Sequence, residues 1–166
     1  MQEGAAQIGR GGGPSSVATG VAVLDHLVGL LASTGGFEIR LEVAPDEPEA
    51  EVGTAGATLG AAFRPLLARD GAARRGFGVT PAEEALAMVV VEVSERWLVV
   101  SNADLTSTRA GGLRTDLAAA FLNGLAEAAG LTVHVRLLEG EDSQHVLEAM
   151  FKALGVALAR ASRVDI

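Results

Sequence analysis

Two side chains near the C-terminal end of the chain are spaced so that they can share a ligand. His145 and Glu148 lie three residues apart at the start of a helical pattern, so both can lie on one helical face and bind a cation. His134 lies on the preceding strand and faces away from its apolar residues. The other interpretation is an exposed histidine at a solvated helix start, where Glu148 only complements the helix dipole. Spacing alone leaves both interpretations open.

Hydropathy patterns predict the elements that position these residues. Residues 113–129 are predicted as a helix with one apolar stripe, which Gly130 ends. Apolar and polar residues then alternate over 131–137, which predicts a half-buried strand. An acidic turn at 139–142 leads into the last helix, which has one apolar face and carries His145.

The same order of elements occurs once earlier in the chain. A helical pattern begins at Thr19 and stops at Gly36. Residues 37–43 then alternate as a strand, and an acidic loop at 45–51 leads into a small-residue helix that ends near Leu67. Helix, glycine stop, strand, acidic segment and helix therefore occur twice, which indicates duplication.

Duplication predicts an α+β fold with two βαβα-type halves, in which mostly antiparallel sheets pack against a helical layer. Between the two copies, residues 86–93 and 97–100 are predicted as strands. We expect a single domain over residues 17–166, made of pseudo-repeats at about 17–85 and 86–166.

Composition excludes several classes of protein. The chain has 166 residues, a net charge of −8 and 49% apolar residues, which argues against a nucleic-acid-binding protein. It has no cysteine, so disulfides and thiolate metal sites are excluded. No apolar run is long enough for a membrane span, and residues 1–16 are expected to form a flexible glycine-rich lead without the features of a signal peptide. We therefore expect a soluble, cytoplasmic protein without a nucleic-acid or membrane partner.

Five segments resemble, in order, the motifs of one enzyme family. They are TGVAVLDHL at 19–27, PAEEAL at 81–86, SERW at 94–97, LTVHV at 131–135 and EAMFKAL at 148–154. The family counterparts are TGIGFLDHM, PMDEAL, SGRP, TLHV and EAxFKAL, which belong to imidazoleglycerol-phosphate dehydratase, the manganese lyase of histidine biosynthesis. The resemblance extends from Thr19 to Ala161 and implies the same duplicated fold.

The resemblance also implies an assembly and a metal centre. Family members form large symmetric oligomers with active sites between subunits, so a homo-oligomer of three or more copies is expected. Two manganese ions bind the substrate imidazole ring as an imidazolate, and each ion takes three histidines and one glutamate. These ligands come from two HHxxE motifs and from the histidines of LDHM and TLH. Arginines and a lysine hold the phosphate of the small phosphorylated substrate.

Several residues of this chain match those functional positions. Every histidine in the chain falls on a ligand position, and Glu148 matches the glutamate of the second HHxxE motif. The resemblance therefore implies these metal ligands: His26, His134, His145 and Glu148. It also implies these phosphate-binding residues: Arg74, Arg96 and Lys152.

Other ligand positions of the family have no ligand here. Glu49, Ala50 and Gly53 stand where the first HHxxE motif should be, and Gln144 replaces the first histidine of the second motif. Four of the eight ligand positions are thus lost, and the family's opening RxTxET strand is also missing. Loss of four ligands should abolish a dinuclear centre.

Two functions follow from this mixed pattern. The first is a catalytically impaired or inactive paralogue that acts as a binding or assembly subunit, and the missing first HHxxE motif favours it. The alternative is an active manganese-dependent dehydratase that converts imidazoleglycerol phosphate to imidazoleacetol phosphate with a rebuilt metal site. Carboxylates also bind manganese, so Glu49 or Glu51 could take part in such a site.

Overall fold

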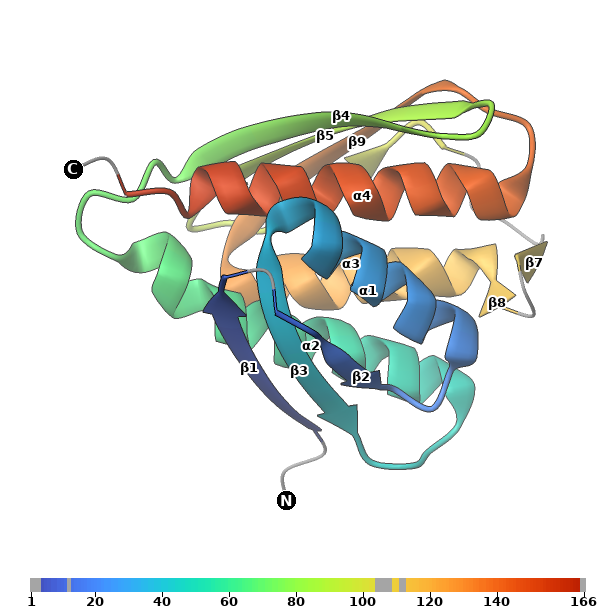
Figure 1. The fold of residues 1–166 in the computed structure, drawn as a ribbon, viewed down its shortest axis with the longest axis horizontal. Coiled ribbons are helices and arrows are strands. Elements are labelled where there is room, and N and C mark those ends of the chain that lie inside the picture. The colour runs from blue at the N-terminus through green and yellow to red at the C-terminus, as the bar shows by residue number, and fades with distance from the viewer. Residues whose placement is uncertain (1–3, 12, 104–108, 111–112, 165–166) are drawn as a thin grey trace.

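The computed structural model describes residues 4–11, 13–103, 109–110 and 113–164. In the first half, a three-stranded sheet (the first sheet) has the order β1-β3-β2, where β1 is antiparallel and β2 parallel to β3. Two helices follow its strands in the chain (Figure 1). The elements of this half are β1 Gly4–Arg10, β2 Ser16–Ala18, α1 Ala22–Gly35, β3 Phe37–Val43 and α2 Pro48–Ala68.

The second half contains a four-stranded sheet (the second sheet) with the order β4-β5-β9-β6. Here β5 is antiparallel and β6 parallel to β9, and β4 adds an antiparallel edge strand next to β5. A short pair, β7 with β8, precedes the third helix. The elements are β4 Arg75–Ala82, β5 Ala85–Val93, β6 Leu98–Ser101, β7 Arg109–Ala110, β8 Leu113–Arg114, α3 Thr115–Ala129, β9 Leu131–Glu139 and α4 Ser143–Ala161.

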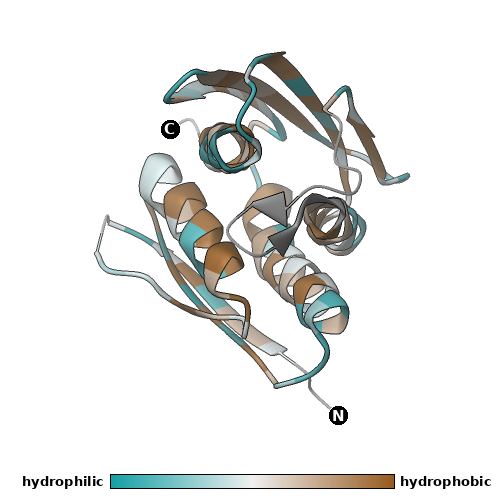
Figure 2. Ribbon diagram, turned by 90° about the vertical axis from the view of Figure 1, so that its right-hand side faces the viewer, coloured by the Kyte–Doolittle hydropathy of each residue, from teal (hydrophilic) through white to brown (hydrophobic). Residues whose placement is uncertain are grey.

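The two sheets repeat the same topology, because β1-β3-β2 and β5-β9-β6 share strand order and strand directions. The helices lie between the sheets, which form the two outer layers (Figures 1 and 2). Apolar residues of the inner sheet faces and of the helices form one core, which includes Phe37, Phe63, Phe121 and Phe151. The predicted duplicated α+β fold is confirmed.

Glycines bring helices of the first half into close contact with helices of the second half. Gly60 of α2 lies against the carbonyl oxygen of Leu125 on α3, where an added Cβ would be 2.5 Å from that oxygen. Gly155 of α4 lies in the same way against the carbonyl oxygen of Leu31 on α1. Since these contacts involve backbone atoms, neither position has room for a side chain.

The prediction of a flexible lead over residues 1–16 is wrong for Gly4–Arg10, which form β1 along the whole of β3. The opening strand expected to be missing is therefore present in this half. Glycine and alanine give this segment little intrinsic strand preference, but pairing with β3 supplies the hydrogen bonds and Ile8 packs against the core. At Gly4 an added Cβ would be 2.6 Å from the Thr58 hydroxyl of α2, so glycine allows the strand to approach this helix.

Helix boundaries also differ from the sequence-based expectation. The predicted acidic loop over 45–51 ends earlier, because α2 begins at Pro48 and includes Glu49 and Glu51 in its first turn. A proline in the first turn and carboxylates near the positive end of the helix dipole both favour this start. No described helix is long and apolar enough to cross a membrane.

Candidate functional site

The TGVAVLDHL segment forms the turn before α1 and its first two turns. The Thr19 hydroxyl donates a hydrogen bond of 2.5 Å to Oδ1 of Asp25, and the backbone N–H of Thr19 donates to the same oxygen. Gly20 has φ +88°, and a side chain there would collide with the Glu51 carboxylate. Three residues of this motif therefore fix the turn that places His26 on the exposed side of α1.

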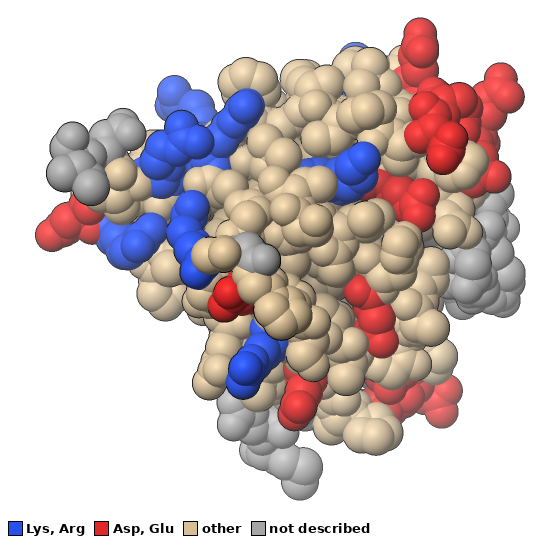
Figure 3. All heavy atoms as spheres, in the orientation of Figure 1, with Lys and Arg blue, Asp and Glu red and all other residues tan. Residues whose placement is uncertain are grey.

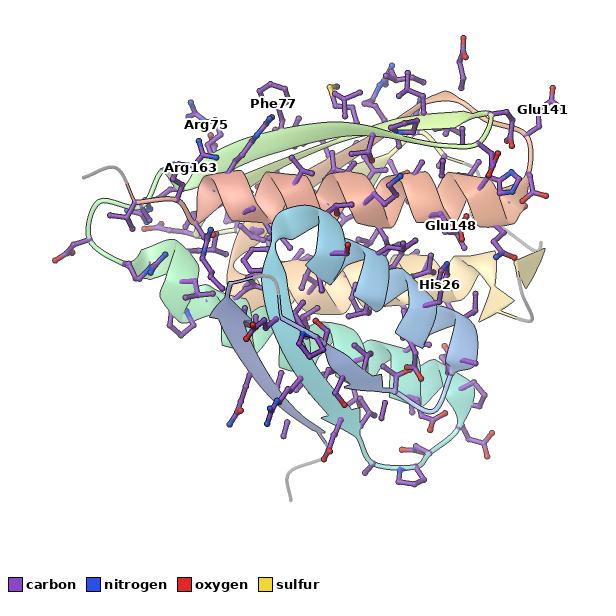
Figure 4. The ribbon with its side chains drawn as sticks, viewed as in Figure 1. His26, Arg75, Phe77, Glu141, Glu148 and Arg163 are labelled. Carbon is purple, nitrogen blue, oxygen red and sulfur yellow. The ribbon has the colours of Figure 1, made fainter. Side chains whose placement is uncertain are left out.

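His26 forms a pair with Glu148 across the contact between α1 and α4 (Figure 4). Nε2 of His26 lies 2.8 Å from Oε2 of Glu148, and the two side chains are 51% and 18% exposed. The structure thus brings together two of the predicted metal ligands, which lie 122 residues apart in the chain.

His145 forms a second histidine–carboxylate pair at the start of α4. Its Nδ1 contacts Oε1 of Glu84, which lies in the two-residue turn between β4 and β5. The other Glu84 oxygen accepts hydrogen bonds from the backbone N–H groups of Glu141 and Asp142, at 3.0 and 3.1 Å. Asp142 caps α4 by accepting from the backbone N–H groups of Gln144 and His145. Glu84 therefore ties the β4–β5 turn to the start of the last helix.

These contacts shift the acidity of both partners. The backbone N–H of Glu141, then the His145 ring and the N–H of Asp142, lower the pKa of Glu84 to about 2. The hydrogen bond to Glu84, with smaller contributions from the Asp142, Glu84 and Glu83 charges, raises the pKa of His145 above its ordinary value. The Glu84 carboxylate thus stabilises the protonated His145 ring.

Replacing Glu84 should lower the pKa of His145. In Glu84→Gln the charge-assisted hydrogen bond to Nδ1 is lost, whereas Glu83→Gln removes only a more distant charge. NMR titration of the ring protons measures both variants, and only three histidines contribute signals. We expect the larger decrease in Glu84→Gln. An unchanged pKa of His145 in that variant, or an equal decrease in both, would contradict this pairing.

His134 lies apart from both pairs. It is exposed on β9, between Val90 of β5 and Val100 of β6, whereas its neighbours Val133 and Val135 are buried toward the helices. Among the described residues, no group of three or more His, Cys, Asp or Glu side chains is close enough to hold a metal ion. The described part of one chain therefore does not by itself assemble the manganese centre that the resemblance implies.

The predicted phosphate-binding residues lie at two ends of the second sheet. The Arg74 carbonyl accepts from the N–H of Val93 at one end, and Arg96 follows in the turn after β5. Nζ of Lys152 donates a hydrogen bond of 2.6 Å to the carbonyl oxygen of Pro81, near the other end of β4. Seven strand residues at about 3.3 Å each separate Arg74 from Pro81 by about 23 Å. The three cations therefore do not converge within one chain.

Basic and acidic side chains gather at opposite ends of this face of the molecule. Basic side chains gather where α4 ends, and acidic ones gather where α4 begins (Figure 3). At the basic end, Arg10 and Arg69 both donate to Ser162, and the charges of Arg69 and Arg163 add to burial in lowering the pKa of Arg10. One end of the molecule is thus suited to anions and the opposite end to cations.

Comparison with known proteins identifies the family. The family model for imidazoleglycerol-phosphate dehydratase matches residues 19–158. The chain belongs to this family. The imidazoleglycerol-phosphate dehydratase of Pelobacter propionicus is 37% identical over 159 residues, which cover 93% of this chain and 82% of the relative. That of Acetivibrio thermocellus is 36% identical with the same coverage.

Solved structures of the family have the same fold. Imidazoleglycerol-phosphate dehydratase from Staphylococcus aureus has a TM-score of 0.88 at 29% identity, over 96% of this chain and 93% of that chain. The Pyrococcus furiosus enzyme, solved in complex with (S)-C348, has a TM-score of 0.87 at 29% identity. The match covers 99% of this chain and 92% of that chain. Family and fold, as predicted from the motifs, are both confirmed.

The internal repeat locates the first-half counterparts of the family's second HHxxE motif. Gly60 and Gly155 make equivalent contacts in the two halves, so α2 and α4 can be aligned on them. Glu49, Ala50 and Gly53 of α2 are then the counterparts of Gln144, His145 and Glu148 of α4. The same three residues stand at the first HHxxE motif in the family resemblance. None of the three is a histidine, and glutamate occupies only the first of these positions.

Glu84 was not among the site residues predicted from sequence. It lies within PAEEAL, a segment that pointed only to the family resemblance. The signal available in the sequence was a pair of adjacent glutamates in a tight turn, which is typical of a solvated surface. Its contact with His145 joins residues 61 positions apart and depends on the β4–β5 turn reaching the start of α4.

Proposed function

We propose that the chain is a catalytically impaired or inactive member of the imidazoleglycerol-phosphate dehydratase family that acts as a binding or assembly subunit. The observation that carries this proposal is the composition of α2, where Glu49, Ala50 and Gly53 replace a complete HHxxE motif. An imidazolate needs two cations to stabilise the negative ring. With half of the ligand positions lost, neither ion keeps a full set.

Nearby carboxylates are poor replacements for the lost ligands. Glu51 is 7% exposed, lies under the turn at Gly20, and its Oε2 accepts from the backbone N–H of Asp46 at 3.3 Å. Turning this side chain outward would leave that N–H unpaired and open a space below Gly20. Glu49 is exposed, but it is the only carboxylate at the three motif positions, and neither of its neighbours in the chain is a histidine. These features support loss of the first metal position rather than its reconstruction.

The proposal includes a homo-oligomer of three or more copies with shared sites. Arg74 and Arg96 lie far from His26 and His145 within one chain, so a site that combines these metal ligands with the two arginines requires a second copy. The outer face of the second sheet exposes Phe77, Val79, Leu98 and Val100, and exposed apolar faces of this kind commonly form interfaces. We propose that this face, which also carries His134, binds another copy. A small phosphorylated ligand would then bind between subunits.

An active manganese-dependent dehydratase is the second candidate. Two preformed histidine–carboxylate pairs favour it, His26 with Glu148 and His145 with Glu84. Imidazole nitrogens and carboxylate oxygens are suitable ligands for a divalent ion such as manganese. If copies contribute both pairs and His134 to one site, a single ion with altered chemistry becomes feasible.

Metal content per subunit distinguishes these candidates. The purified chain would be incubated with excess manganese, freed of loosely bound ion and analysed for metal and protein, alongside an assay for loss of water from imidazoleglycerol phosphate. We expect no tightly bound manganese and no turnover. One ion per subunit would support the second candidate. Two ions together with turnover would refute the proposal.

A further inference from the structure

The outer face of the first sheet contains a hollow of about 550 Å³. We call it the Arg40 hollow, and the residues that line it are Ala5, Ala6, Gln7, Pro14, Ser15, Ser16, Arg40 and Glu42. It lies on the side of the sheet that faces away from the helices, because Ile39 and Leu41 of the same strand are buried in the core. It is therefore separate from the histidine–carboxylate pairs at the start of α1 and α4.

The strand register aligns three polar side chains in this hollow. Gln7 of β1 and Ser16 of β2 are both paired with Arg40 of β3, one on each side. Residues directly opposite one another on neighbouring strands point to the same face of a sheet. A row of amide, guanidinium and hydroxyl groups thus crosses the floor of the hollow, and all three can donate to one oxyanion.

Two hydrogen bonds hold the wall of the hollow in place. The backbone N–H of Gly13 donates to Oε1 of Glu38 at 2.7 Å, and Oγ of Ser15 accepts from the N–H of Ile39 at 2.9 Å. The segment from Gly13 to Ser16 is thereby fixed along β3. Ala5 on the opposite side is small, which leaves space above the strands. The hollow is therefore a defined feature of the fold.

Its charges are unpaired among the described residues. Neither Arg40 nor Glu42 makes a side-chain hydrogen bond or ion pair there, although both point to the same face two positions apart on β3. Opposite charges on an open strand are often only solvated, but here they lie in a hollow with an aligned Gln7 and Ser16. A cation and an anion at this spacing match a small molecule that carries both charges.

We propose that the Arg40 hollow binds a free α-amino acid. Its carboxylate would be held by Arg40 with Gln7 and Ser16, and its ammonium group by Glu42. The counterpart of this site in the second half is different, since β9 has His134 between Val90 and Val100, and Arg136 in place of Glu42. The site is thus particular to the first half, and it does not depend on whether the chain holds metal or has dehydratase activity.

Calorimetric titration with the standard α-amino acids tests this proposal. Each one that binds would be compared with its deaminated acid and its decarboxylated amine. We expect saturable binding of at least one amino acid, weakened about tenfold or more in Arg40→Met, because a hydrogen bond between charged groups is lost. Glu42→Gln should remove the preference for the amino acid over the deaminated acid. Arg64→Met, which changes an exposed arginine on α2, is the matched control and should bind normally.

Three results would overturn the proposal. The first is that no amino acid in the panel binds. The second is equal binding by the natural chain and Arg40→Met, whose integrity is checked by thermal unfolding. The third is a smaller assembly for Arg40→Met than for the natural chain in light scattering, which would identify the hollow as an interface between copies. Lack of metal in the same preparations affects none of these outcomes.

Discussion

The combined variant Glu49→His, Ala50→His, Gly53→Glu and Gln144→His is expected to bind about two manganese ions per subunit and to dehydrate imidazoleglycerol phosphate. These changes restore both HHxxE motifs at the positions that the internal repeat and the family resemblance both indicate. Losing a residue that only supports a metal ligand costs about 10–100-fold in affinity, so loss of four ligands costs more. Restoring all four at once should therefore change the function of the chain more than any single replacement.

The structure has room for the new side chains. Glu49 and Ala50 are exposed at the start of α2, and an added Cβ at Gly53 would meet nothing within 4 Å. Gln144 is half-buried, and its backbone N–H is already held by the Asp142 cap. The substitutions should therefore change the ligands without disturbing the core, and circular dichroism would verify this.

The control variant carries glutamine at the α2 positions, as Glu49→Gln, Ala50→Gln and Gly53→Gln. Glutamine has a similar size and helix preference but is a weaker ligand than histidine or glutamate. Metal analysis and the dehydration assay should give the same values for this control as for the natural chain. A folded histidine variant that still holds no metal would show that the missing ligands are not what limits metal binding by this chain.

Sequence patterns predicted those helices and strands whose own side chains alternate or repeat clearly enough to indicate the secondary structure. Phe37–Val43 alternates without interruption, and β3 has those bounds. The strands β1 and β4 were not predicted, because glycine, alanine and proline dominate GAAQIGR and RGFGVTPA. In β4, added Cβ atoms at Gly76 and Gly78 would meet the backbone of α4, so these glycines allow the helix to approach the strand. Glycine has a low intrinsic preference for strands, so it argues against a strand in the sequence. In β4, however, close packing against α4 requires glycine.

The positions of some candidate site residues follow from the sequence. The family motifs indicated His26, His145 and Glu148 as metal ligands, which stays a prediction, and the structure places His26 of α1 against Glu148 of α4, three residues after His145. The contacts between these residues were not predictable. The order of the motifs along the chain does not show that Glu148 contacts His26 or that Glu84 contacts His145. Such pairs depend on helix crossing and on the length of a turn, which only the assembled fold determines.

Replacing Gly155 by alanine is expected to destabilise the chain by about 3 kcal/mol, whereas Gly53→Ala should stabilise it by about 1 kcal/mol. Both glycines lie inside helices, so alanine gives each the same gain in helix preference. They differ in tertiary contact, since the new methyl group at Gly155 would overlap the Leu31 carbonyl oxygen, while the one at Gly53 lies in open space. A backbone atom cannot rotate away, so α1 and α4 must separate and lose buried contacts.

The internal repeat provides a further control for this comparison. Gly60→Ala should destabilise the chain as Gly155→Ala does, because Gly60 makes the equivalent contact with Leu125. Urea unfolding at a fixed protomer concentration measures all three variants, since any self-association makes the midpoint depend on concentration. If Gly155→Ala and Gly60→Ala were as stable as Gly53→Ala, the close helix pairs could not be what holds the two halves together. If the free energy of unfolding instead decreases in Gly155→Ala and Gly60→Ala and increases in Gly53→Ala, the duplicated fold uses the same glycine contact twice. One contact joins α1 to α4 and the other joins α2 to α3.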